Sequence, residues 1–247
     1  MAMQYANNGS LLSYLHHNIS KLTWKMKFTL LKDIARLMHC VHYNELMHCD
    51  LHCGNIVFHD DGETVKPFIC DLGLSKTENA NSKTVYGVLP YVAPEVLHAR
   101  KFTRKSDVYS FGILMILIAS GEPPFRDKVF ELSLALEICQ GLRPAMPESA
   151  PEEYKEIAEW CCNGDPNKRP SAFELHNRMI AFSKTLDKGN SDGNEWNTIY
   201  NAKKMKPLSR VEKEHKYSSK LLPTTADIPS MEITYDMSSI QGRNEIV

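Results

Sequence analysis

Three polar side chains stand at spacings that suit the transfer of a phosphoryl group. Asp50 is followed five positions later by Asn55, and Asp71 opens an Asp-Leu-Gly turn sixteen residues after that. A carboxylate can orient and deprotonate an attacking hydroxyl, while amide and carboxylate oxygens suit magnesium. We therefore assign Asp50 to an acceptor hydroxyl, and Asn55 and Asp71 to a metal that binds phosphate oxygens.

Two short strands are predicted to position these residues. Apolar and β-branched residues at 56–58 and 65–70 predict the strands, and Asp60-Asp61-Gly62 supplies the turn between them. Asp71 then ends the second strand, where its carboxylate can project into a cleft.

Helical periods dominate the remaining sequence. The predicted helices are a short one at 11–15 with Ser10 as its N-cap, one at 23–42, a buried one at 106–119, and amphipathic ones near 128–140, 151–162 and 171–183. The fold class that follows is α+β, mainly α, with a short β-hairpin.

The order of motifs resembles the eukaryotic protein kinases. The motifs are His48-Cys49-Asp50-Leu51-His52-Cys53-Gly54-Asn55, Asp71-Leu72-Gly73, Ala93-Pro94-Glu95, Asp107 and Arg169. The resemblance covers residues 1–183 and is to the C-terminal lobe, most similar to the tyrosine-kinase-like serine/threonine branch. It implies ATP and Mg²⁺ as cofactors, a protein substrate, and transfer of the ATP γ-phosphoryl to serine or threonine.

The resemblance also assigns further residues. Residues 1–10 look like the hinge between kinase lobes, with Met3 as gatekeeper, the backbone of Gln4, Tyr5 and Ala6 against adenine, and Val57 beneath the ring. Asp107 matches a buried aspartate that braces the catalytic loop. Glu95 and Arg169 match a buried ion pair.

The chain departs from the kinase pattern in two ways. Cys49, His52 and Val88 replace an arginine, a lysine and a threonine that usually support catalysis. The 247 residues also contain no glycine-rich loop and no strand lysine before the hinge, and the first lysine is Lys21. The chain is then either part of a longer kinase or a pseudokinase, a scaffold lobe that binds partners without catalysis. The uncovered lobe surface predicts self-association.

Composition narrows the class of protein. A formal net charge of −1 argues against nucleic-acid binding, and the longest apolar run, 111–119, is too short for a membrane span. Seven cysteines and no leader-like start predict a reducing, cytoplasmic location. The cysteines and histidines at 39–53 leave a zinc site as a rival reading, although one six-residue stretch rarely wraps a tetrahedral ion.

The composition changes after Thr185. Residues 184–247 are rich in polar residues, and apolar ones scatter without a period, which predicts a disordered tail. Its lysines fit a solvated tail or a docking segment for an acidic partner.

Overall fold

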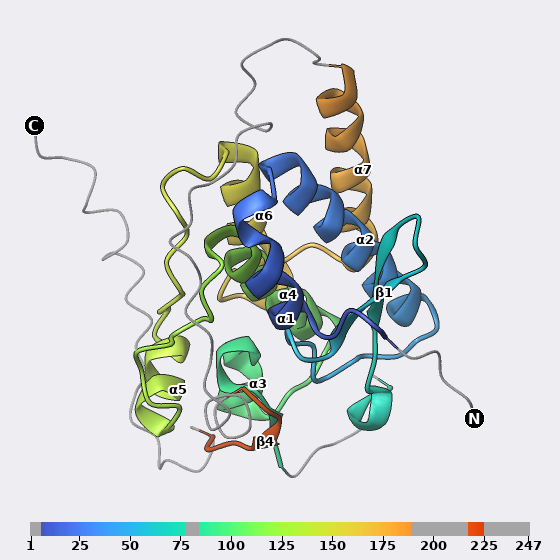
Figure 1. The fold of residues 1–247 in the computed structure, drawn as a ribbon. Coiled ribbons are helices and arrows are strands. Elements are labelled where there is room, and N and C mark those ends of the chain that lie inside the picture. Colours follow the sequence, from blue (N-terminus) through green and yellow to red (C-terminus); the bar gives the residue numbers. More distant parts are fainter. Residues whose placement is uncertain (1–5, 78–83, 189–216, 225–247) are drawn as a thin grey trace, which may run out of the picture.

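The computed structural model describes residues 6–77, 84–188 and 217–224. Their helices are α1 (Leu11–Asn18), α2 (Trp24–Tyr43), α3 (Pro94–Ala99), α4 (Arg104–Ser120), α5 (Leu132–Cys139), α6 (Glu152–Cys161) and α7 (Ala172–Lys188). Short 3-10 helices lie at Ile19–Lys21, Leu72–Leu74, Leu89–Tyr91 and Pro166–Lys168. Strands β1 (Ile56–Asp60) and β2 (Val65–Ile69) form one antiparallel pair, and β3 (Tyr86–Gly87) and β4 (Lys220–Leu221) form another (Figure 1). The prediction of a mainly helical fold with a short hairpin is confirmed.

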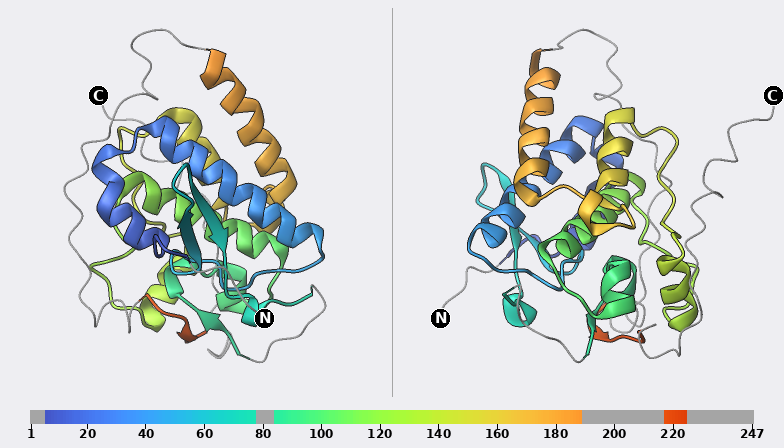
Figure 2. Two further views of the ribbon diagram at one scale, coloured as in Figure 1. Left: turned by 45° about the vertical axis from the view of Figure 1, so that its right-hand side comes forward. Right: turned by 180° about the vertical axis from the view of Figure 1, so that it is seen from behind.

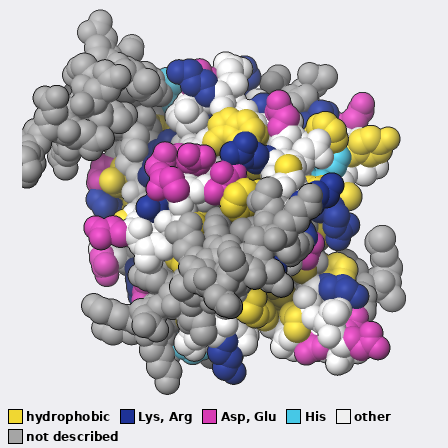
Figure 3. Space-filling model, turned by 90° about the horizontal axis from the view of Figure 1, so that it is seen from above, with side chains coloured by type: hydrophobic (Ala, Val, Ile, Leu, Met, Phe, Trp, Pro, Cys, Tyr) yellow, Lys and Arg dark blue, Asp and Glu magenta, His cyan; other side chains and the backbone are white. Residues whose placement is uncertain are grey.

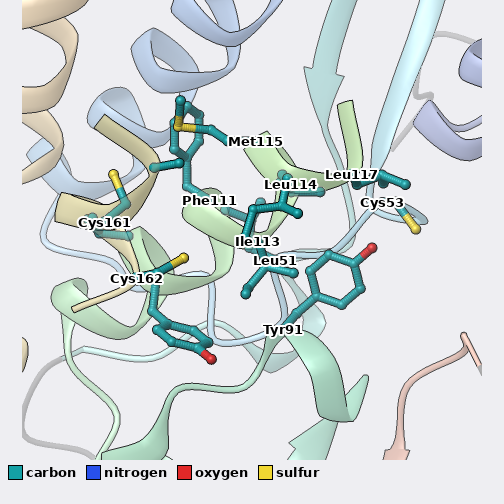
Figure 4. Close-up of a cluster of buried hydrophobic side chains, with 14 of the residues drawn as sticks. Leu51, Cys53, Tyr91, Phe111, Ile113, Leu114, Met115, Leu117, Cys161 and Cys162 are labelled. Carbon is teal, nitrogen blue, oxygen red and sulfur yellow. The ribbon is translucent and has the colours of Figure 1, made fainter. Parts of the chain in front are cut away.

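Helix α4 forms the centre of the core. Its side chains are buried from Ser106 to Ala119, so it is apolar all round rather than amphipathic. A Cβ atom on Gly112 would lie 2.5 Å from the Cys162 sulfur, so only glycine allows α6 and the residues after it to pack this closely. Figure 4 shows Phe111 and Leu114 of α4 between Cys161 on one side and Tyr91 on the other.

Helices α2 and α7 pack against each other on one side of this core (Figure 2). Phe28 and Phe182 meet edge to face, with their ring centroids 5.4 Å apart. Lys27 is fully buried, and its Nζ donates to the Ala119 carbonyl at 2.8 Å, which ties α2 to the end of α4. Burial lowers the pKa of this lysine to about 8.

The hairpin lies between the residues before α1 and the loop that carries Asp50. The Phe58 amide donates to the Gly9 carbonyl at 2.9 Å, and the Asn8 amide donates to the Phe58 carbonyl at 3.1 Å. At the other end, Ile56 pairs with Ile69, and the Cys70 amide donates to the Asn55 carbonyl at 2.9 Å. Asn55 and Asp71 therefore flank the same end of the hairpin.

Two segments of the range expected to be a disordered tail have defined structure, which corrects that expectation for them. Helix α7 continues to Lys188, and residues 217–224 lie against the body of the protein, with β4 close to α3 (Figures 1 and 2). Tyr217 and Leu222 are each 5% exposed, and this burial gives the second segment its place. The remainder of 184–247 lies outside the described residues.

The surface carries charges of both signs. On the face in Figure 3, acidic and basic side chains of the described residues are interspersed rather than gathered by sign. No helix within the described residues is long and apolar enough to cross a membrane. All seven cysteines lie within the described ranges and are free thiols.

Candidate active site

The loop that carries Asp50 is held by one buried carboxylate from α4. Asp107 is 1% exposed, and it accepts hydrogen bonds from the backbone amides of His48 at 2.7 Å and Cys49 at 3.0 Å. The same carboxylate contacts Nε2 of His42 at 2.8 Å. Cys49 has a left-handed backbone, with φ of 65°, and these bonds fix that unusual conformation. The predicted bracing role of Asp107 is confirmed.

Asp50 and Asn55 are brought together, as their spacing predicts. Both side chains are buried. The Asn55 Nδ2 donates to the Asp50 carbonyl at 2.9 Å and approaches the Asp50 carboxylate at 3.3 Å. These bonds use the Asn55 amide nitrogen, and its amide oxygen is of a type that can act as a metal ligand.

Asp71 follows the end of the hairpin that also carries Asn55, but in the hydrogen bonds of the described residues its side chain contacts the residues after it and neither Asp50 nor Asn55. It follows β2 by two positions, has a left-handed backbone with φ of 60°, and accepts a hydrogen bond from the Gly73 amide at 3.3 Å. Nε2 of His48 also contacts the Cys70 carbonyl at 3.0 Å, which ties the strand end to the catalytic loop. Asp71 is exposed, so its carboxylate is open to a ligand.

A magnesium ion fits this donor set. Asn55 and Asp71 offer one amide and one carboxylate, and magnesium typically uses one or two such protein ligands together with water and phosphate oxygens. Within the ranges that the structure describes, no group of three or more His, Cys, Asp and Glu residues could hold a metal ion by itself. Phosphate oxygens would therefore have to complete the coordination.

His52 is part of the site, although the sequence indicated it only as a departure from the kinase pattern. Its Nε2 lies 3.7 Å from the Asp50 carboxylate. Burial and the Gly54 amide, which faces Nδ1 at 3.0 Å, oppose protonation of the ring. The neighbouring side chains of Asp50 and Cys53 outweigh them and raise the pKa of His52 to about 9.

Ser219 also reaches the site, and sequence reasoning missed it. Its hydroxyl donates to the Asp50 carboxylate at 2.5 Å, across 169 positions of sequence. The sequence offers only a weak indication of this contact. Tyr217, Leu221 and Leu222 are apolar residues close together within the polar residues 184–247. Nothing in that cluster indicates which part of the fold it contacts.

Cys49 is a buried thiol rather than an exposed one. Burial and the negative charge of Asp107 raise its pKa to about 12. The thiol donates to the Met47 carbonyl at 3.7 Å. Cys49 therefore carries no charge at neutral pH and cannot bind an anion as an arginine would.

The hinge assignments are only partly within the described residues. Met3, Gln4 and Tyr5 lie outside them. The Ala6 carbonyl accepts a hydrogen bond from the Gly9 amide at 3.4 Å, and Ser10 forms a β-bridge with Val57. The segment that follows the expected hinge thus runs beside Val57, which is half-buried.

Glu95 and Arg169 form the predicted ion pair. Each guanidinium nitrogen, Nη1 and Nη2, lies 2.7 Å from one carboxylate oxygen, and the Arg169 side chain is fully buried. Arg169 also donates to the Asn163 and Lys105 carbonyls, at 2.7 and 2.9 Å. Glu95 belongs to α3, and Arg169 lies in the loop before α7. The pair therefore joins α3 to that loop.

The comparisons with known proteins agree with this geometry. Residues 1–179 match the family described as protein tyrosine and serine/threonine kinase. The chain belongs to the eukaryotic protein kinase family. Over 186 residues, 72% of the chain, it is 31% identical to a protein named "Probable serine/threonine-protein kinase" in Dictyostelium discoideum. Over 204 residues, 74% of the chain, it is 32% identical to "MDIS1-interacting receptor like kinase 2" of Arabidopsis thaliana.

The match covers a minor part of these relatives. It spans 14% of the Dictyostelium protein and 19% of the Arabidopsis protein. A third relative, also a probable serine/threonine-protein kinase of Dictyostelium discoideum, is 29% identical and is covered to 46% of its length. The matched part is the kinase region, and each of these relatives has further residues outside it.

Proposed function

We propose that this protein is a serine/threonine protein kinase of the tyrosine-kinase-like branch, and that residues 1–183 form its C-terminal lobe with residues 1–10 as the hinge. The observation that carries the proposal is the hydrogen bond from the Ser219 hydroxyl to the Asp50 carboxylate. A carboxylate that binds a serine hydroxyl is already arranged as a kinase needs for its acceptor.

Asp50 would orient the acceptor hydroxyl and take its proton. As the acceptor oxygen bonds to the γ-phosphorus of ATP, the bond from that phosphorus to the bridging oxygen breaks and ADP leaves. The hydroxyl proton passes to the Asp50 carboxylate. Asn55 keeps that carboxylate in place through the contact of its Nδ2 at 3.3 Å.

Asn55 and Asp71 would bind the magnesium that neutralises the phosphates. Their donor atoms suit a hard cation, and the hairpin register brings the two residues to the same end of β1 and β2. The backbone of Gln4, Tyr5 and Ala6, with Met3 as gatekeeper and Val57 below, would form the adenine site, as the resemblance implies.

A scaffold without catalysis is the second candidate, and three departures from the kinase pattern favour it. Cys49, His52 and Val88 stand where kinases usually have an arginine, a lysine and a threonine that support catalysis. The two candidates differ in whether phosphoryl transfer occurs once an upper lobe is present.

The test uses a two-lobed form, in which an upper lobe with a glycine-rich loop and a strand lysine precedes Met1. We expect Asp50→Asn to lower transfer of γ-phosphate to a serine peptide by at least about 100-fold while ATP affinity changes little, because Asp50 addresses the acceptor. Asp71→Ala should instead lose magnesium-dependent ATP binding. Asp33→Asn, on the remote face of α2, is the matched control and should keep full turnover. Full turnover in Asp50→Asn refutes the assignment, and no transfer in any form favours the scaffold.

A further inference from the structure

Residues 217–224 lie beside Asp50 and the strand Tyr86–Gly87. Ser219 is the residue that contacts the carboxylate, and Nε2 of His52 lies 3.1 Å from the same hydroxyl. The Ser219 residue is nevertheless exposed. Its hydroxyl is therefore held by two side chains of the loop that carries Asp50, while part of the residue faces solvent.

The backbone of this segment binds as an added strand. Lys220 pairs with Gly87 and Leu221 with Tyr86 in antiparallel register, and the Leu222 amide donates to the Val85 carbonyl at 2.9 Å. Strand addition binds an extended peptide through main-chain groups and leaves the flanking side chains to decide specificity.

Gly87 allows this strand to approach. Its φ is 154°, at the edge of the range that favours glycine, and a Cβ atom there would lie 3.1 Å from Val92 and 3.5 Å from the Asp50 carboxylate. The added carbon would crowd the Val92 side chain and would lie in ordinary contact with the Asp50 carboxylate and, at 3.9 Å, with Leu222 of the bound segment.

Two apolar anchors flank Ser219. Tyr217, two positions before it, meets Phe130 edge to face at 5.3 Å and donates from its hydroxyl to the Pro124 carbonyl at 3.4 Å. Leu222, three positions after it, is 5% exposed. Thr224 adds a hydrogen bond from Arg100 at 3.4 Å.

We propose that the surface formed by Asp50, the strand at Tyr86–Gly87 and the Phe130 ring is the acceptor site of this kinase. It takes extended serine peptides with an aromatic residue at −2 and a leucine at +3, and residues 217–224 are its occupant within the chain. Ser219 is then both the model acceptor and a self-phosphorylation site. Phosphorylation of Ser219 rests on the proposed function, whereas the binding of residues 217–224 at this site does not.

Self-phosphorylation of Ser219 needs only ATP, with its magnesium, as a second reactant. The Ser219 oxygen bonds to the γ-phosphorus of ATP, ADP departs with the bridging oxygen, and the serine proton passes to Asp50. The product phosphate then lies beside Asp50. Once the Asp50 proton has passed to solvent, the carboxylate and the phosphate repel each other, so the phosphorylated segment leaves the site and uncovers it for other substrates.

The test is a binding experiment on the full 247-residue chain, and it needs no turnover. A fluorescent peptide with the sequence of residues 214–226 is titrated by anisotropy against the wild type and against Tyr217→Ser/Leu222→Ser, whose own segment has lost both anchors. A tethered segment has an effective concentration on the order of 1 mM. We therefore expect the anchor variant to bind the peptide at least about tenfold more tightly than the wild type.

The matched control is Tyr43→Ser/Val129→Ser, which removes one tyrosine and one aliphatic side chain that are 79% and 67% exposed. It should bind the peptide as weakly as the wild type. A peptide with the same two serines at 217 and 222, or with phosphoserine at 219, should bind the anchor variant at least tenfold less well. Equal affinities for the wild type and the anchor variant, or no binding to either, overturn the proposal.

Hydrogen exchange on the unaltered chain gives a second measurement, in case the anchor variant does not fold. The Leu222 amide should exchange at least about tenfold more slowly than in the free peptide. Exchange at the free-peptide rate overturns the occupancy. If the peptide binds as expected but a two-lobed form phosphorylates nothing, the proposed function fails and the binding site stands.

Discussion

At the residue scale, His52 lies between the Asp50 carboxylate and the Ser219 hydroxyl. Its ring faces Asp50, Cys53, Ser219 and the Gly54 amide, and the Tyr91 ring lies 6.1 Å away. Burial opposes protonation of the ring, but the neighbouring Asp50 and Cys53 side chains raise its pKa, so folding stabilises the charged ring.

This pKa predicts a pH-dependent part of the stability. A group whose pKa is raised on folding, from 6.5 to about 9 here, stabilises the fold below pH 6.5, and this contribution is lost as the pH rises through 9. The loss between these limits should be on the order of 1–3 kcal/mol. Urea unfolding at pH 6.5 and pH 9 should therefore show a smaller change for His52→Gln than for the wild type. The same change in both would mean that the Gly54 contact keeps the ring neutral.

At the element scale, the Glu95–Arg169 pair joins α3 to the loop before α7. Arg169→Met leaves the Glu95 carboxylate, 14% exposed, without its partner. The free energy of unfolding should fall by about 3–5 kcal/mol. Glu95→Gln/Arg169→Met should recover part of the loss, because no charge then remains buried alone. Chemical denaturation of the three proteins checks this, and a loss below 1 kcal/mol in the single variant contradicts it.

The long elements could be predicted because their patterns are local. Helix α2 repeats apolar residues at helical spacing, α4 is a continuous apolar run, and the Asp60-Asp61-Gly62 turn indicates the hairpin. Helix α3 has only six residues and starts at Pro94, so it shows no usable period. Strands β3 and β4 form by pairing residues more than 130 positions apart, and no local pattern specifies such a pairing.

The same distinction applies to the site. The spacing of Asp50, Asn55 and Asp71 follows from one loop and one hairpin, and the sequence contains both. The partnership of Asp50 with Ser219 depends on where a distant segment binds. The pKa of His52 depends on burial and on neighbours that only the fold brings together.

At the scale of the whole molecule, exposed apolar side chains at and just after β2 predict self-association of residues 1–247. Phe68 of β2 is 40% exposed, and Leu72 just beyond is 48% exposed. Exposed apolar side chains of this size are typical of interaction sites. We expect light scattering at tens of micromolar to show species larger than a monomer, and Phe68→Ser/Leu72→Ser to shift them toward monomer. A stable wild-type monomer at this concentration contradicts the prediction.

Nucleotide binding by residues 1–247 should be weak. Residues 1–247 on their own contain no glycine-rich loop and no strand lysine ahead of the expected hinge to contact the phosphates. We expect a dissociation constant for ATP·Mg of about 1 mM or weaker, so 1 mM ATP should add only about 0.4 kcal/mol to the stability. A clear shift in the melting temperature at micromolar ATP, measured by differential scanning fluorimetry, is the contrary result.

The central claim is that Asp50 directs phosphoryl transfer to a serine placed as Ser219 is. The most direct measurement is phosphosite mapping by mass spectrometry of the two-lobed form after incubation with ATP and magnesium. The account predicts phosphate on Ser219 within the wild type, with little on the adjacent Ser218, and none on Ser219 in Asp50→Asn. Phosphorylation of other proteins without any phosphate on Ser219, or equal labelling of Ser219 in Asp50→Asn, would contradict it.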